Sequence, residues 1–98
     1  MMNFELDQVY LEEVYDNTEY GTTTLYFIAP KDLLGDSYPE AIHSEISLEF
    51  PTDNPEARFA SAMISPTRET ENGYEDYDWR SIELEYPVIE SLIQLMMK

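Results

Sequence analysis

Carboxylates are the only chemically reactive side chains that this chain carries in abundance. Among its 98 residues, 21 aspartates and glutamates oppose five lysines and arginines, which gives a formal net charge of −16 with the single histidine neutral. The acids recur along the whole chain and are densest between residues 69 and 78. From this stretch and the glutamates after it we select a candidate partner-binding set: Glu69, Glu71, Glu75, Asp76, Tyr77, Asp78, Glu83 and Glu85.

The spacing of these acids suggests a repeating anionic surface. Side chains two positions apart on a β-strand share one face and lie about 6.6–6.8 Å apart. Glu83 and Glu85 have this spacing, as do Asp76 and Asp78 if their segment is extended. Each strand of B-DNA carries one phosphate about every 3.4 Å along its axis. Rows of carboxylates on a rigid sheet would resemble that backbone, so we expect a DNA mimic that occupies the basic site of a nucleic-acid-binding protein.

Aromatic residues within the acidic stretch support a binding role. Tyr74, Tyr77 and Trp79 alternate with the acids there. Tyrosine and tryptophan are favoured anchors at protein interfaces, and surrounding carboxylates would steer a basic partner towards them. For Trp79 alone we favour a place in the hydrophobic core, because its large apolar area is costly to expose.

Nucleophilic and nucleotide chemistry find no support. The only histidine, His43, falls on the polar side of a predicted strand, where we expect a plain surface residue. The segment 35–37 (Gly-Asp-Ser) lacks the second glycine of a nucleophile elbow. The three glycines are isolated, so they form no phosphate-binding loop. The absence of cysteine excludes thiolate zinc sites and disulfides. We therefore expect a protein that is not an enzyme and holds no cofactor.

Hard cations are the remaining ligand class to consider. The segment 16–21 begins like a calcium loop, with glycine in sixth place, but Thr18 and Tyr20 stand at ligand positions and Phe27 replaces the bidentate glutamate. A weak cation site within residues 69–78 stays open, although charge runs usually face water. Two alternatives to the DNA mimic follow. The first is a soluble adaptor or immunity-type domain whose acidity serves solubility, and the second is a small carboxylate or divalent-metal enzyme.

The charge also limits the partners. Nucleic acids and anionic lipids both require lysines and arginines on the protein, so we expect a basic protein partner and neither direct nucleic-acid binding nor membrane binding. The segment 1–7 lacks the basic and apolar regions of a signal peptide. Together with the lack of cysteine, this predicts a cytoplasmic protein. The apolar run 25–29 is far shorter than a membrane span.

The elements that position these residues form a single predicted domain over residues 1–98. A period near two predicts a strand in residues 4–15, with a helix as the alternative, and a strand in residues 22–28. The turn composition of residues 16–21 joins them into a hairpin. Residues 30–39 form a connection that can hold one helical turn at 31–35.

The rest of the chain alternates predicted strands and loops before a terminal helix. Residues 40–50 form the clearest amphipathic strand, with one face made by Ile42, Ile46, Leu48 and Phe50. We predict a buried strand at 57–64 (alternatively a short helix), a polar loop at 66–73 and a last strand at 79–84. Helical spacing follows Pro87, and Lys98 would complement the helix dipole. The fold class is α+β, an antiparallel sheet of about four to five strands with one C-terminal helix packed on a face.

Overall fold

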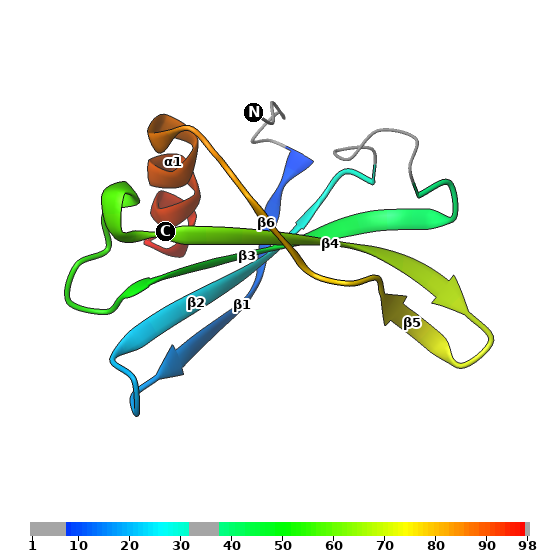
Figure 1. Cartoon of the computed structure of the whole chain (residues 1–98), viewed down its shortest axis with the longest axis horizontal. Helices are drawn as coiled ribbons and strands as arrows, with labels where there is room; N and C mark the ends of the chain where they lie inside the picture. Colours follow the sequence, from blue (N-terminus) through cyan, green and yellow to red (C-terminus); the bar gives the residue numbers. More distant parts are fainter. Residues whose placement is uncertain (1–7, 32–37, 98) are drawn as a thin grey trace.

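The computed structural model describes residues 8–31 and 38–97 (Figure 1). Within these residues the chain forms six strands, one turn of 3₁₀ helix and one α-helix. The elements are β1 (Tyr10–Asn17), β2 (Thr22–Ala29), β3 (Ala41–Pro51), η3 (Ala57–Phe59), β4 (Ser61–Thr70), β5 (Gly73–Asp76), β6 (Arg80–Ile82) and α1 (Tyr86–Met96).

The strands form one antiparallel sheet. Its main path runs β1-β2-β3-β4-β5, and β6 pairs with β4 beside β5. The predicted α+β fold with a C-terminal helix on the sheet is confirmed, although the described residues hold six strands rather than four or five. Figure 1 shows the sheet curling so that the β1–β2 hairpin and β5 both bend away from the side that carries α1.

The N-terminal hairpin forms as predicted, with its first strand shifted. β1 begins at Tyr10, and the predicted strand residues 4–7 lie outside the described part of the chain, as do residues 32–35 of the predicted helical turn. The turn closes through the Tyr20 N–H, which donates to the Asn17 carbonyl (3.2 Å). Gly21 adopts φ 67°, a left-handed conformation that a residue with a Cβ adopts only at a steric cost.

The core face of β3 follows the predicted alternation with one exception. Ile46 and Leu48 are fully buried and Phe50 is 2% exposed, as expected for alternate positions on a covered face. Ile42 was expected on the same face, and this prediction is wrong, since its side chain is 42% exposed. A bulge between Ala41 and His43 changes the alternation, so Ala41 is buried instead.

The predictions around β4 hold only in part. Ala57–Phe59 forms a 3₁₀ turn, in line with the short-helix alternative, and the predicted strand begins at Ser61. The polar loop predicted at 66–73 is wrong, because β4 continues to Thr70. Pro66 is tolerated inside β4 because its carbonyl accepts from the Tyr77 N–H (2.9 Å), away from β3. The N–H and C=O of a strand residue point to the same neighbour, so the missing donor leaves the β3 ladder intact.

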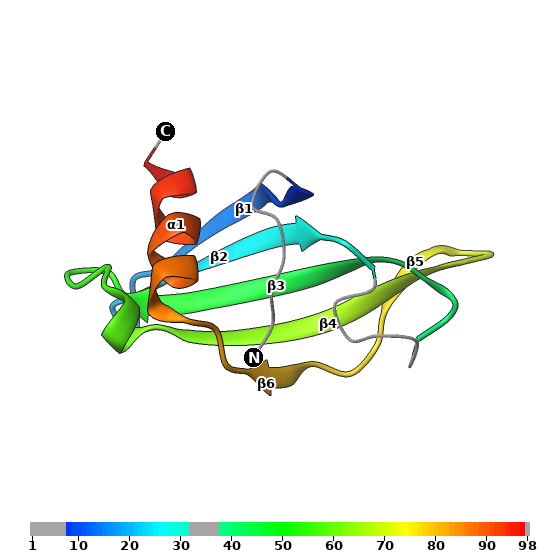
Figure 2. The same ribbon diagram turned by 90° about the horizontal axis from the view of Figure 1, so that it is seen from above.

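The helix covers one face of the sheet at one end. α1 begins at Tyr86 with Pro87 in its first turn, as the sequence predicts. Its buried residues are Ile89, Leu92 and Ile93, which join the core side chains of β2, β3 and β4. Figure 2 shows α1 at one end of the strands and β5 at the other. Lys98, which was expected to complement the helix dipole, lies outside the described residues. Within the described residues, no helix has the length and apolar character needed to cross a membrane.

Candidate binding face

The face of the sheet opposite α1 is hollowed. A cavity of about 560 Å³ and a neighbouring cavity of about 510 Å³ share Glu12, Glu45 and Asp76, and we call the two together the acidic hollow. β1 and β5 stand at opposite ends of the strand path, yet both line it because the sheet curls. Its lining residues are Tyr10, Glu12, Glu13, Tyr26, Ile28, Ile42, His43, Glu45, Ser47, Met63, Thr67, Tyr74, Asp76 and Trp79.

Four carboxylates converge in the acidic hollow. Glu12 and Glu13 come from β1, Glu45 from the middle of β3, and Asp76 from the end of β5. Among the described residues, no lysine or arginine lines the hollow. The hollow is therefore a concave surface of one charge sign, a shape that concentrates the electric field.

Glu45 is the most perturbed of these acids. Partial burial, the negative charges of Asp76 and Glu12, a hydrogen bond with Asp76 and the charge of Glu13 raise the pKa of Glu45 to about 7. Burial is the largest cause, because a charged carboxylate loses hydration inside the hollow. Near neutral pH, Glu45 therefore holds a proton for part of the time.

A bulge in β1 brings two consecutive glutamates into the hollow. Leu11 pairs with Phe27 and Glu13 with Tyr26, so Glu12 is the extra residue between two successive pairs. Consecutive residues of a regular strand face opposite sides of the sheet. With the bulge, both Glu12 and Glu13 line the same cavity.

Asp76 is fixed by its cross-strand neighbour. The Thr67 hydroxyl donates to Asp76 Oδ1 (2.7 Å), and Thr67 is itself 2% exposed. The two residues pair directly between β4 and β5. This contact holds one carboxylate oxygen towards β4, which limits how far Asp76 can turn away from Glu45.

Trp79 lies at the hollow and not in the core beneath α1, so the preference for a core position is wrong. The half-buried indole meets Tyr26 edge to face, with ring centroids 6.4 Å apart and planes at 69°. The chain passes from β5 to β6 along the edge of β4, where Tyr77 N–H bonds to Pro66. That crossing carries Trp79 to the concave side, where it contributes an aromatic wall.

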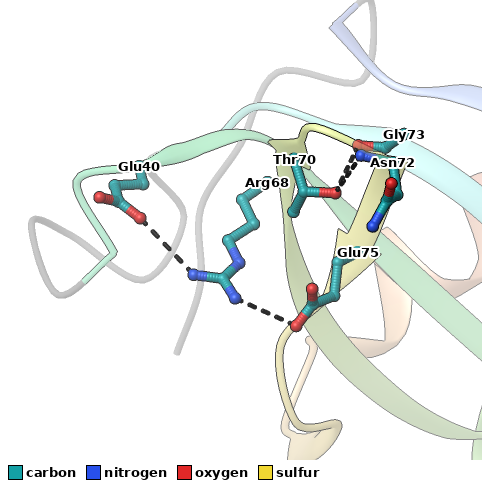
Figure 3. A network of polar contacts seen from close by, with 6 residues as sticks. All are labelled: Glu40, Arg68, Thr70, Asn72, Gly73 and Glu75. Carbon is teal, nitrogen blue, oxygen red and sulfur yellow. Dashed lines mark hydrogen bonds and ion pairs between the residues drawn. The ribbon is translucent and has the colours of Figure 1, made fainter.

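Of the eight sequence-selected residues, the structure places only Asp76 in the acidic hollow. Glu69 and Glu71 are exposed on the β4–β5 hairpin. Glu75 pairs with Arg68 on the opposite face, at 3.1 Å between carboxylate and guanidinium, and Arg68 also contacts Glu40 at 3.6 Å (Figure 3). The charge of Glu75 is therefore partly balanced.

Tyr77 and the remaining acids follow this hairpin in the chain. The Tyr77 ring packs on Tyr38, with centroids 4.7 Å apart, so it has a structural contact. β5 ends at Asp76 and β6 at Ile82, so Asp78, Glu83 and Glu85 all lie outside strands. The expected carboxylate rows at strand spacing therefore do not form at these pairs. A role for these residues in partner binding stays a prediction.

The centre of the hollow was not predicted from the sequence. Glu45 lies on the polar face of the predicted strand at 40–50, together with His43, but it is not among the selected site residues. The alternation of Glu45 with the buried Ile46 indicates that Glu45 faces the other side of the sheet, where a polar residue can contribute to a binding surface. Glu12 and Glu13 gave no such signal, since their shared orientation depends on the bulge.

Metal coordination gains no geometric support from the described residues. Within 8–31 and 38–97, no group of three or more histidine, aspartate or glutamate side chains is arranged to hold a metal ion. His43 lines the hollow at its β3 side. The acids therefore form a broad anionic surface rather than a compact coordination sphere.

A comparison of the chain with protein-family models, curated proteins and solved structures finds no match. The function is therefore inferred from the acidic hollow and the charge around it.

Proposed function

We propose that this chain is a cytoplasmic, non-enzymatic acidic binding protein whose hollow receives a basic segment of a nucleic-acid-binding protein, in the manner of a DNA mimic. The observation that carries the proposal is the convergence of carboxylates from β1, β3 and β5 in one cavity, to whose lining the described part of the chain contributes no lysine or arginine. A partner's cationic side chain would supply the missing countercharge.

The described arginines are engaged elsewhere. Arg58 and Arg68 form ion pairs with nearby glutamates, and the Arg80 guanidinium donates to the Tyr38 hydroxyl. None of the three lines the acidic hollow. A cation from another molecule would therefore meet carboxylates that no arginine of this part of the chain neutralises.

The expected energetics favour recruitment of a basic protein. The net charge of −16 attracts cationic partners over a range set by the salt concentration. Inside the hollow, a guanidinium or ammonium group would relieve the repulsion among Glu12, Glu45 and Asp76. Tyr26 and Trp79 supply aromatic surface beside them, which adds contact area and cation–π attraction.

A small carboxylate enzyme is the second candidate, favoured by one observation. Glu45 and Asp76 line the same cavities, and the pKa of Glu45 is raised to about 7. A carboxyl group with a raised pKa beside a second acidic residue is a common arrangement in enzymes that hydrolyse by acid–base catalysis. This candidate predicts that Glu45→Gln abolishes a hydrolytic activity, whereas the binding proposal predicts a change in affinity alone.

The proposed function is tested by capture from cell lysate with matched charge variants. The hollow variant carries Glu12→Gln, Glu13→Gln and Glu45→Gln. The control variant carries Glu19→Gln, Asp53→Asn and Glu90→Gln, which removes the same number of acids at exposed positions outside the hollow. Capture is compared at about 50 mM and about 200 mM salt, with and without duplex DNA as competitor.

The proposal predicts three results together. Wild type and control retain basic nucleic-acid-binding proteins at low salt, and both release them at higher salt or on addition of DNA. The hollow variant retains much less. Recovery of only neutral or acidic proteins would contradict the proposal, as would an equal loss of capture by the hollow and control variants.

A further inference from the structure

We infer that the outer edge of β1 accepts an extended basic segment of the partner as an added strand of the sheet. This inference rests on the proposed function and specifies how the partner is held. Strand addition to an exposed sheet edge supplies backbone hydrogen bonds, and alternate side chains then provide specificity.

The edge is available in the described part of the chain. β1 ends the strand path, and β2 is the only strand within 8–31 and 38–97 that pairs with it. Each edge strand leaves alternate N–H and C=O groups pointing outwards. Within the same residues, no turn or loop forms a backbone hydrogen bond to these outward groups of residues 10–16. The carbonyl of Asn17, the last residue of β1, accepts the hydrogen bond that closes the hairpin turn.

The side chains of β1 suit packing against another strand. Tyr10 is 62% exposed, Val14 44% and Tyr15 54%. Aromatic and β-branched residues stabilise a sheet when a cross-strand neighbour covers them. Here they lie along an eight-residue strand whose burial pattern is mostly exposed, so β1 presents apolar area that a neighbour would remove from water.

The charges on β1 select the neighbour. Glu12, Glu13 and Asp16 stand on the same strand as these apolar residues. A second copy pairing through β1 would bring acids against acids between two proteins of charge −16, and like charges on paired strands destabilise the pairing. A segment with lysine or arginine at alternate positions would replace these repulsive contacts between acids with attractive contacts between opposite charges.

The edge and the acidic hollow share residues. Tyr10, Glu12 and Glu13 belong to β1 and also line the hollow. Side chains on one side of an added strand would therefore lie beside Glu12 and Glu13 at the rim of the hollow. Those on the other side would lie near Val14, which pairs with the core residue Leu25. The fitting segment alternates basic and apolar residues.

The bulge limits the pairing to a short stretch. It lies between Leu11 and Glu13, so regular geometry extends from residue 13 to residue 17. Bulges are a common means by which edge strands avoid indiscriminate pairing. A short pairing region provides few backbone hydrogen bonds, so stable binding also needs the charge contacts with the acids of β1. This need restricts the edge to basic segments.

The test uses two synthetic octapeptides and the full chain labelled with ¹⁵N. The first peptide alternates arginine and valine and has blocked termini. The second has the same sequence but carries N-methyl groups at its two central residues. Consecutive N–H groups of a strand point to opposite edges, so this change blocks pairing on both edges while the charge is kept. Affinity is measured at low salt, and amide hydrogen exchange is followed by NMR.

The inference predicts that the unmodified peptide binds about tenfold more tightly than the methylated peptide, as expected from the loss of one backbone hydrogen bond and the steric clash of the methyl group on the paired edge. Outward amides within residues 13–17 should exchange at least severalfold more slowly in the complex. Equal affinities without protection in β1 would overturn strand addition while leaving docking in the hollow, and hence the proposed function, intact.

The other outcomes also decide the question. If neither peptide binds, strand addition is wrong, and the proposed function is judged separately by the capture experiment. If the outward amides of residues 13–17 are already protected in the protein alone, the edge is occupied without a partner and the inference is wrong. Sedimentation then distinguishes a second copy from a contact within the chain.

Discussion

Glu45 of β3 and Asp76 of β5 line the same cavity from either side of the intervening strand β4. Glu45 pairs with Ser65, and Asp76 pairs with Thr67 two residues further along the same strand. The two acids are therefore neighbours on one face of the sheet although 31 positions separate them in the sequence. Burial and the negative charge of Asp76 are the two largest causes of the raised pKa of Glu45, and the proton that Glu45 retains is central to the behaviour of the hollow.

The first prediction concerns pH and stability. The pKa of Glu45 is raised from 4.5 to about 7 in the folded protein, so folding retains a proton that the unfolded chain releases. The resulting stability is fullest below pH 4.5 and decreases as the pH rises to about 7. Glu45→Gln should remove this decrease and stabilise the protein at pH 8 by about 1–2 kcal/mol, allowing for solvent screening.

Urea unfolding from pH 5 to pH 8 measures this effect. Glu49→Gln is the matched control, because Glu49 is exposed on the same strand and lies outside the hollow. It removes the same charge without touching the Glu45–Asp76 pair. If both variants change the pH dependence equally, general repulsion rather than the pair is responsible.

The second prediction tests the core register. Phe50 is 2% exposed, so Phe50→Ala should cost about 3–5 kcal/mol of unfolding free energy, the usual range for a buried phenylalanine. Phe59→Ala should cost less than about 1 kcal/mol, since Phe59 is 46% exposed. Chemical denaturation of both variants checks the assignment. A Phe50→Ala protein as stable as wild type would refute the β3 register.

The third prediction concerns salt. Repulsion within a protein of charge −16 disfavours the compact state, and added ions screen it. The melting temperature should rise between about 10 mM and about 150 mM sodium chloride. The hollow variant lacks three of the acids and should show a smaller rise. A melting temperature that falls with salt would show that favourable ion pairs outweigh the repulsion.

The fourth prediction uses the only tryptophan as a probe of the hollow. Trp79 is half-buried beside Tyr26 and lines the same cavity as Glu13 and Glu45. Binding of the arginine–valine peptide should shield the indole and reduce its quenching by acrylamide. The hollow variant should show little change at the same peptide concentration. Unchanged quenching in the wild-type complex would place the peptide away from Trp79.

Local patterns predicted most of the elements but few of their exceptions. The apolar alternation around Ile46 and Leu48 identified β3, and Pro87 marked the start of α1, because both signals depend only on neighbouring residues. Ile42 could not be placed in the same way. A bulge reverses the alternation there, and the sequence carries no marker for it.

The candidate site was harder to predict because it depends on tertiary geometry. Pro66 indicated a loop in the sequence. In the structure its carbonyl faces the segment that follows β5, so β4 continues past this residue. That crossing determines where Asp76 and Trp79 lie. The acidic stretch from Glu69 onwards dominated the sequence, whereas the cavity is centred on Glu45, whose partners come from strands far apart in the chain.

The central claim is that a cation binds in the hollow beside Glu45, and proton release on binding tests it most directly. Calorimetric titration with the arginine–valine peptide at pH 7, in two buffers of different ionisation enthalpy, counts the protons released. A cation beside Glu45 favours its charged form, so wild type should release about half a proton per peptide while Glu45→Gln releases almost none. Binding without proton release by wild type, or with equal release by both proteins, would contradict the claim.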